Sequence, residues 1–336
     1  MRSFPKLALL IGVLSVAASG CSSENSSLPT AAAPAIVNQE GHYQRSWMLA
    51  EASTENLLYI ADYLAGGILV YSHTSPTYRL VGILSHPSSD LNLCVDSEQD
   101  VFATNYYSVV EYKHGATSPL RILGGLQAYV YGCSVDSTTG TLAVANANES
   151  TRTPTAYVSF FKRSGGRHTT LSLPEPYRDG EGIAYDGSGN LFVTAYVPGT
   201  SPVFVLLELP KDSKQFVEVT LGKTFVGSGQ IAWDGKYLDF ADPRQNVIYR
   251  FAIDGQRLRA KGTIVLQRSY DIGSFFVDGA TLIAPASSKP SYSDSGPRLI
   301  NFYDYPAGGK KTGVIRGVSS PTGVVVSLAK KEQLER

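Results

Sequence analysis

A short apolar run that ends in aspartate, followed by a turn and a second apolar run, recurs along this chain. The copies are LNLCVD ending at Asp96, YGCSVD at Asp136, EGIAYD at Asp186, GQIAWD at Asp234, GSFFVD at Asp278 and, ending in serine, TGVVVS at Ser327. Successive end points lie 40, 50, 48, 44 and 49 residues apart. This period matches a four-stranded β-propeller blade, whereas helical repeats would need 3.6-residue apolar stripes, which this sequence lacks.

The runs that follow the aspartates indicate strands covered on both faces. Residues 191–196 and 203–207 are almost continuously apolar and do not alternate with polar residues. Blades stacked around an axis would bury both faces of every sheet. The turns agree, because residues 186–190 and 234–236 tolerate positive φ between antiparallel strands. The composition, with 20 Tyr, 32 Gly and 18 Pro in 336 residues, also favours many short strands and turns.

The second-strand runs predict six blades within residues 43–336. These runs are residues 57–61, 101–104, 142–146, 191–196, 237–241 and 281–284. The first blade lacks a suitable inner strand of its own, because residues 49–51 would bury the carboxylate of Glu51. Residues 324–326, all valine, fit better. We therefore expect an all-β, six-bladed β-propeller of four-stranded antiparallel blades, its ring closed by the C-terminal strand. A partial seventh blade is the alternative.

The N-terminus is typical of an exported lipoprotein. Arg2 and Lys6 precede the apolar run 7–17, which is too short to span a bilayer, and small residues lead to Cys21. The sequence Ala-Ser-Gly-Cys at 18–21 resembles a bacterial lipobox. We expect residues 1–20 to be a signal peptide and Cys21 to carry the lipid. An ordinary secretory signal with an incidental cysteine is the alternative.

Residues 21–42 are rich in Ser, Ala and Pro and hold few large apolar side chains, so they are interpreted as a flexible tether. Ser22 directly follows the cysteine. By resemblance to Gram-negative lipoproteins, this residue favours an outer-membrane protein that faces the periplasm. The sequence thus predicts that the protein is attached to the membrane through its N-terminal lipid anchor.

The stretch GIAYDGSGNLFVTAY at residues 182–196 resembles an NHL-type repeat, as found in six-bladed propellers that include the gluconolactonase-like family. The resemblance covers residues 47–330. It implies that a divalent cation such as calcium could lie at the channel mouth, with Glu181 at a position where that family usually carries Asp. Tyr131-Gly132 departs from the Asn-Gly of that family. The resemblance therefore supplies an alternative function, a metal-dependent lactonase-like hydrolase with Glu181 as a ligand.

Sequence motifs for catalysis are missing. The five histidines are scattered, and the chain has no HExxH, GxSxG elbow, P-loop or complete GxGxxG. The formal net charge is zero, with the basic residues dispersed, which excludes the electrostatic footprint of a nucleic-acid-binding protein. We expect a monomeric, non-catalytic binding scaffold with no resident cofactor, whose partner is an unknown small ligand or an envelope protein.

Cys94 and Cys133 lie on expected inner strands of adjacent blades. Cys94 stands two residues before Asp96, and Cys133 three residues before Asp136. Pleating should then direct the two side chains to different faces. We therefore expect two buried free thiols in preference to a disulfide.

The loops that follow the second strands, and those that lead into the inner strands, should share the face around the channel mouth. Polar and aromatic residues suited to a hydroxylated or peptide-like ligand gather there. The predicted ligand-binding residues are Asp62, Asn105, Tyr106, Asn146, Glu181, Tyr196, Gln230 and Asp242, with Tyr107, Asn148, Asp90, Asn92 and Tyr131 nearby. The alternative for each is an ordinary role in turns or edge packing.

Overall fold

A computed structural model describes residues 45–74, 77–85, 92–126, 129–148, 155–199, 202–287 and 298–330. Every described residue belongs to one compact unit of the chain, Pro34–Arg336. The expected signal peptide at 1–20, the lipidation site Cys21 and the tether at 21–42 lie outside the described residues.

The described residues form β-sheets with a single short 3-10 helix, Ala50–Thr54. One sheet has the order β1 (Trp47–Met48), β4 (Leu80–Ser85), β3 (Gly67–Ser72), β2 (Leu57–Asp62), β25 (Pro321–Ser327). A second contains β5 (Leu93–Val95), β6 (Val101–Thr104), β7 (Val109–Tyr112) and β8 (Pro119–Leu123). A third contains β9 (Tyr129–Val135), β10 (Leu142–Asn148), β11 (Thr155–Phe161) and β12 (Thr169–Ser172).

The remaining strands follow the same plan. An eight-stranded sheet joins β13 (Arg178–Tyr185), β14 (Leu191–Val197), β15 (Val203–Leu209) and β16 (Val217–Leu221) to β17 (Ile231–Trp233), β18 (Leu238–Asp242), β19 (Val247–Asp254) and β20 (Arg257–Val265). The join is a parallel pairing of β16 with β20. The last sheet contains β21 (Phe276–Asp278), β22 (Thr281–Ala286), β23 (Leu299–Asp304) and β24 (Gly308–Arg316). Each antiparallel run of four strands is called a blade below and is named by its strands; the first is the β2–β4 blade with β25.

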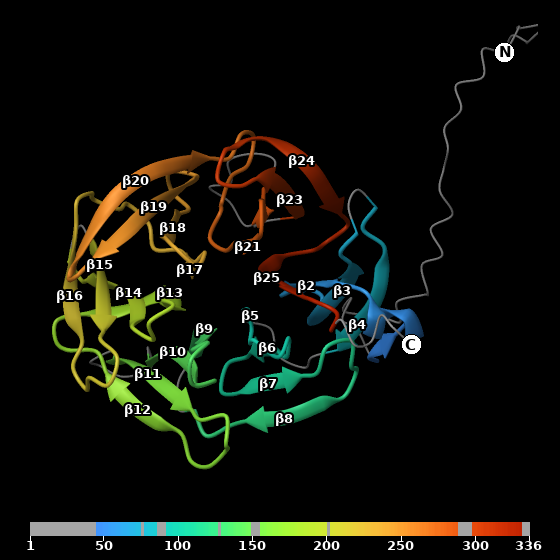
Figure 1. Ribbon diagram of the computed structural model, residues 1–336, viewed down its shortest axis with the longest axis horizontal. Coiled ribbons are helices and arrows are strands. Elements are labelled where there is room, and N and C mark those ends of the chain that lie inside the picture. The colour runs from blue at the N-terminus through green and yellow to red at the C-terminus, as the bar shows by residue number, and fades with distance from the viewer. Residues whose placement is uncertain are drawn as a thin grey trace, which may run out of the picture. The chain divides into compact units, whose positions relative to one another are not determined.

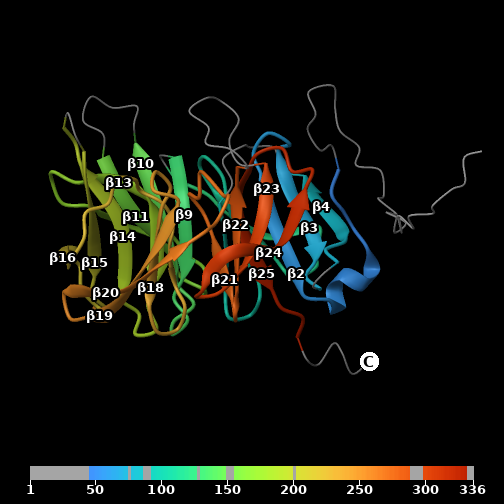
Figure 2. The ribbon, with the colours of Figure 1, turned by 90° about the horizontal axis from the view of Figure 1, so that it is seen from above.

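The blades lie around a common centre, with β5, β9, β17, β21 and β25 drawn nearest to it (Figure 1). This arrangement confirms the expected all-β propeller. The second strands also begin and end close to the expected residues, as β6 at Val101–Thr104 and β14 at Leu191–Val197 illustrate. Viewed from above, the strands run between the two faces of the ring of sheets (Figure 2).

The recurring aspartates close the turns between inner and second strands. The Asp96 carboxylate accepts the backbone N–H of Glu98 at 2.9 Å, and the Asp186 carboxylate accepts the backbone N–H of Ser188 at 2.8 Å. Asp136 and Asp234 each accept the N–H two residues later, also at 2.8 Å. Aspartate stabilises such a turn because its side chain replaces a missing backbone acceptor. This local chemistry explains why the residue recurs once in almost every blade.

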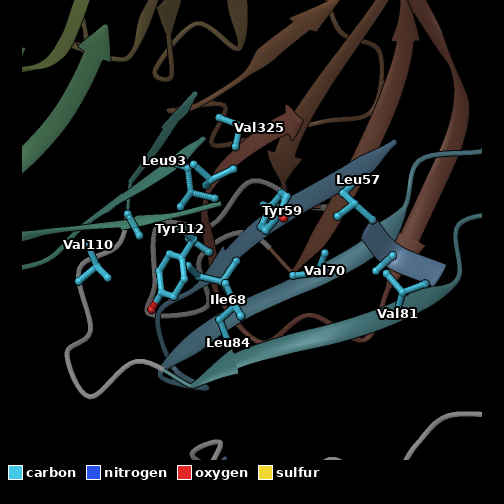
Figure 3. Packing of buried hydrophobic residues seen from close by; sticks show 14 residues of the cluster. Leu57, Tyr59, Ile68, Val70, Val81, Leu84, Leu93, Val110, Tyr112 and Val325 are labelled. Atoms are coloured by element: carbon cyan, nitrogen blue, oxygen red, sulfur yellow. The ribbon is translucent and has the colours of Figure 1, made fainter. Parts of the chain in front are cut away.

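Apolar side chains fill the space between neighbouring blades. Figure 3 shows Tyr59, Val70 and Val325 of the first blade packed with Leu93 and Tyr112 of the β5–β8 blade. All six residues of β2 are buried, so both faces of this strand are covered. Burying apolar surface contributes about 25 cal/mol per Å². The continuous apolar runs of the sequence therefore supply the side chains that pack between neighbouring blades.

Inner strands approach each other closely at glycine. A Cβ atom on Gly182 of β13 would lie 2.5 Å from the carbonyl oxygen of Gly229, which precedes β17. No side chain fits at that distance. Gly182 therefore allows two inner strands to converge near the axis.

The C-terminal strand β25 pairs antiparallel with β2, with Val326 opposite Leu58 and Val324 opposite Ile60. Residues 50–54 form the 3-10 helix and no inner strand. Trp47 and Met48 of β1 pair with β4 at the other edge of this sheet, and they pack against the apolar clusters that contain Val324, Val325 and Val326.

The prediction of two free thiols is wrong, because Cys94 and Cys133 form a disulfide with Cα atoms 5.8 Å apart. As expected from pleating, the two cysteines lie on opposite faces of their own blades. However, one face of each blade packs against the opposite face of the next blade, so these two side chains meet. Cys94 and Cys133 share an apolar cluster with Phe102 and Val144. Leu93, next to Cys94, points into the cluster on the other side of its blade.

Candidate functional site

The second strands end, and the inner strands begin, at one end of the sheets, which we call the channel-mouth face. Asp62 at the end of β2 pairs with Pro321 at the start of β25, and Tyr196 near the end of β14 pairs with Arg178 at the start of β13. The sequence prediction that these loops share a face is consistent with this pairing. The face surrounds the axis that is drawn end-on in Figure 1.

The inner strands line a central cavity of about 250 Å³. Side chains from β5, β9, β13, β17, β21 and β25 contribute to its wall, among them Cys94, Ser134, Ala184, Ala232, Phe276 and Val325. Most of these groups are small or apolar. They offer few directional hydrogen bonds to a ligand in the channel.

Asp62 and Asp242 fasten loops of the ring. Both carboxylates belong to fully buried residues, 0% exposed. Asp62 accepts the backbone N–H groups of Ser319 at 2.7 Å and Ser320 at 3.0 Å, in the loop that leads into β25. Asp242 accepts the N–H of Val226 at 3.1 Å, in the loop that leads into β17. These carboxylates are engaged by the protein itself and are not free for a ligand.

Asn105 and Gln230 also serve the scaffold. The Asn105 side-chain oxygen accepts the backbone N–H groups of Tyr107 at 3.0 Å and Ser108 at 2.9 Å, which closes the turn between β6 and β7. The Gln230 side-chain oxygen accepts the Ser274 hydroxyl at 2.7 Å. This contact ties the start of β17 to the loop before β21. Both side chains thus make hydrogen bonds within the protein.

Asn146 lies at an equivalent place in its blade but is used differently. It follows an irregularity in the pairing of β10 with β9, as Asp62 follows one in the pairing of β2 with β25. Asn146 is 1% exposed, and neither atom of its side-chain amide has a hydrogen-bond partner among the described residues.

The other predicted residues are placed as follows. Tyr196 is half-buried, and its ring lies 6.2 Å from that of Phe204. Asn92 donates its side-chain N–H to the Tyr131 carbonyl at 3.0 Å. Asp90 and the side chains of Glu181 and Asn148 lie outside the described part of the structure, so the predictions about them stay untested.

Three tyrosines gather on the channel-mouth face. The ring centroids of Tyr106 and Tyr129 are 5.1 Å apart, and those of Tyr107 and Tyr129 are 6.0 Å apart. Tyr107 is 55% exposed. Sequence reasoning selected Tyr106 and Tyr107 but missed Tyr129, which begins the next blade. We call these three residues the tyrosine cluster.

Large apolar residues that the sequence analysis did not select are also exposed on this face. Leu64 follows β2, Val203 begins β15, and Val226 lies in the loop before β17; they are 51%, 56% and 44% exposed. Aromatic residues are enriched where proteins bind other proteins, and exposed apolar groups gain free energy when a partner covers them.

A charged network near the opposite end of the β17–β20 blade was also missed. The Arg250 guanidinium lies 4.6 Å from the ring centroids of both Tyr237 and Tyr305, and it pairs with Asp234. The Tyr305 hydroxyl donates to Asp234 at 2.8 Å and also contacts the carboxylate of Asp239. Burial raises the pKa of Asp239 to about 6, against the hydrogen bond from Tyr305 and the charge of Arg250.

Asp234 in the same network behaves differently. Burial opposes its ionisation, but the N–H groups of Tyr237 and Lys236 and the Tyr305 hydroxyl hold its pKa below the ordinary value. Each of these charged groups has a protein partner. The network therefore links β17, β18 and β19 to the segment after β23.

Among the described residues, no group of three or more His, Cys, Asp or Glu side chains could hold a metal ion. The oxygens of Asp62 and Asp242 already accept backbone N–H groups. In the same part of the chain, no helix has the length and apolar character needed to cross a membrane.

No protein-family model matches this chain, and no curated protein sequence matches it either. Solved structures do resemble it. The crystal structure of a nidogen/laminin complex gives a TM-score of 0.64 at 13% identity, covering 82% of this chain and 99% of that chain. A protein of unknown function from Bacteroides caccae gives 0.58 at 9% identity, covering 82% and 99%. A functionally unknown protein from Desulfotomaculum acetoxidans gives 0.51 at 11% identity, covering 87% and 94%. At these identities the likeness shows the β-propeller fold alone.

Proposed function

We propose that this chain is a lipid-anchored envelope protein whose propeller binds another protein, without catalysis, through the channel-mouth face. The tyrosine cluster is the observation that carries this proposal. Its rings lie on the same face of the sheets as exposed Leu64 and Val226, which belong to other blades. Tyrosine is over-represented among the residues that dominate binding energy. The most similar structure described above is a complex of two proteins, which agrees with a binding role.

We further propose that the propeller has six NHL-like blades and that β25 closes the ring. The proposal treats the eight-stranded sheet as two blades, β13–β16 and β17–β20, because each half is an antiparallel run of four strands. It is supported by the pairing of β25 with β2. Closing the ring in this way leaves no open inner edge that invites aggregation.

The proposed export agrees with the disulfide between Cys94 and Cys133, since disulfides persist in oxidising compartments. Lipidation at Cys21 is testable directly. Replacing Cys21 with serine should shift the protein from the membrane fraction to the soluble fraction or block its processing. Unchanged membrane association of the variant would contradict the anchor.

The lactonase-like alternative rests on the family resemblance of Glu181, whose side chain lies outside the described part of the structure. Turnover assays with lactones in the presence of calcium address it. Turnover that is lost in a Glu181→Ala variant would support the hydrolase and contradict a non-catalytic scaffold.

Site-specific photo-crosslinking in cells tests the binding face. A photoreactive residue at position 107 should give a specific adduct. The same residue at position 122 should give none, although Ile122 on the outer strand β8 is 66% exposed. The purified partner should then bind the Tyr106→Ala/Tyr107→Ala variant at least tenfold more weakly than the unmodified protein. Adducts of equal yield at both positions, or unchanged affinity, would overturn the proposal.

A further inference from the structure

A pocket outside the tyrosine cluster lies on the β9–β12 blade, beside the loop that joins β8 to β9. Its walls are Gly125, Leu126, Tyr157, His168, Thr170 and Ser172, and its volume is about 280 Å³. Pockets for drug-sized ligands span roughly 300–1,000 Å³. This junction pocket is therefore the size of a single-ring molecule.

Two buried polar side chains lie beside the pocket. Asn146 of β10 stands directly opposite Tyr157 of β11, and Ser159 of β11 stands directly opposite Thr170 of β12. Directly opposed residues project from the same face of a sheet. Asn146 and Ser159 are therefore next to Tyr157 and Thr170, which form the pocket wall.

These two side chains lack partners within the described residues. Asn146 is 1% exposed and Ser159 is 0% exposed, and neither the Asn146 amide atoms nor the Ser159 hydroxyl makes a hydrogen bond there. A buried polar group without a partner costs about 1–3 kcal/mol. Asp62 and Asp242, at the equivalent place in their blades, satisfy this demand with loop N–H groups. Asn146 and Ser159 instead lie behind the wall residues Tyr157 and Thr170 and are not themselves among the residues that line the pocket.

The chemistry of the wall selects a neutral ligand. Hydroxyl, amide and imidazole groups line or adjoin the pocket, and no Asp, Glu, Lys or Arg is among the residues that line it. On the neighbouring blade, Arg121 and Glu111 pair with each other. Leu126 and Tyr157 add apolar and aromatic surface. A small ring that carries several hydroxyl groups matches this combination.

The junction is also rigid. The disulfide between Cys94 and Cys133 joins the same two blades at their inner strands. The hydrogen bond from Asn92 to the Tyr131 carbonyl, 3.0 Å long, joins them again. A pre-organised pocket loses less conformational entropy when it binds a ligand.

From these observations we propose that the junction pocket binds a neutral monosaccharide-sized polyol and that Asn146 and Ser159 form its hydrogen-bonding floor. The site is separate from the protein-binding role of the tyrosine cluster. It can be right or wrong independently of that role.

Isothermal titration of the mature full-length protein in detergent tests the site. The probes are glucose, galactose and N-acetylglucosamine, with glucuronic acid as the charged comparison. At least one neutral sugar should bind, and glucuronic acid should bind at least tenfold more weakly than the best of them. If no neutral sugar binds at millimolar concentration, or if glucuronic acid binds equally well, the proposal is overturned.

Variants locate the binding. Thr170→Val should weaken binding five- to tenfold, whereas Thr169→Val, on the opposite face of β12, should not change it. Ser159→Ala should weaken binding by a similar factor without lowering the melting temperature of the free protein, because the hydroxyl has no hydrogen-bond partner among the described residues. A merely structural serine would lower the melting temperature instead. If Thr170→Val and Ser159→Ala both bind the sugar with unchanged affinity, the proposal of a sugar site in the junction pocket is overturned. If crosslinking at position 107 is retained at the same time, the protein-binding proposal still stands.

Discussion

Cys94 of β5 and Cys133 of β9 are 39 residues apart in sequence and form a covalent bridge between two neighbouring blades. Closing a loop of this length restricts the unfolded chain, and the entropy model gives about 4 kcal/mol of stabilisation. We expect the Cys94→Ser/Cys133→Ser variant to lose about that much free energy of unfolding in denaturant titrations. Reductant should destabilise the unmodified protein and leave the variant unchanged. Equal sensitivity of both proteins to reductant would contradict this prediction.

Asp62 should be more important for stability than an exposed aspartate at a strand end. Replacing it with alanine leaves the N–H groups of Ser319 and Ser320, whose hydrogen bonds to Asp62 are part-buried, without their acceptor. The expected loss is about 2 kcal/mol, since an unpaired group costs roughly 1–3 kcal/mol when it is buried and less when water reaches it. Asp62→Asn should lose less, because one amide oxygen remains as an acceptor.

The matched control for Asp62 is Asp304→Ala, an exposed residue at the end of β23. It should change the free energy of unfolding by less than about 0.5 kcal/mol. Chemical denaturation of the three variants at neutral pH provides the measurement. Equal losses for Asp62→Ala and Asp304→Ala would show that Asp62 does not fasten the loop.

Much of the fold could be predicted because its physical cause is local. The Asp turns are set by residues within two positions of each other, as in Asp186 and Ser188, and the two-sided apolar runs report burial directly. The prediction of free thiols was wrong because it assumed that two bonded cysteines must lie on the same face of their respective blades. Cys94 lies on the face of its blade that packs against the next blade, and Cys133 lies on the face of that next blade that packs back against it, so the two side chains meet.

The sequence identified several residues that lie at the channel mouth, but it did not identify what those residues contact. The sequence indicates that Asp62 and Asp242 end second strands at one face. It cannot show that Asp62 binds Ser319, because 257 residues separate them. The same limit hid Tyr129, which completes an aromatic cluster only after two blades stack, and Arg250, whose partner Tyr305 lies 55 residues away.

Stability should depend on pH through Asp239, which is 0% exposed. Burial raises its pKa from 3.8 to about 6, so the folded protein holds this proton more tightly than the unfolded chain does. The contribution of Asp239 is fully present below pH 3.8 and is lost as the pH rises through about 6. We therefore expect Asp239→Asn to make the free energy of unfolding decline less between these pH values.

Asp254→Asn is the control for this pH dependence, because Asp254 is an exposed residue paired with Arg259 at the surface. Denaturant titrations at several pH values from 4 to 7 should give the unmodified slope in this control and a smaller slope in Asp239→Asn. Identical slopes in all three proteins would rule out Asp239 as the titrating group.

The central claim is that β25 completes the first blade and holds the ring that builds the channel-mouth face. Removing residues 321–336 tests it most directly. Val324, Val325 and Val326, which are 1%, 1% and 3% exposed, would be lost, and β2 would be left with an open edge. A chain ending at Lys330 is the control, and a peptide of residues 321–330 is the complement.

We predict that the chain ending at Ser320 shows no cooperative unfolding transition, that the added peptide restores the transition, and that a peptide carrying Val325→Asp does not. The chain ending at Lys330 should unfold like the full chain. A Ser320-terminated chain that unfolds cooperatively at the full-length midpoint, with no response to the peptide, would contradict the claim.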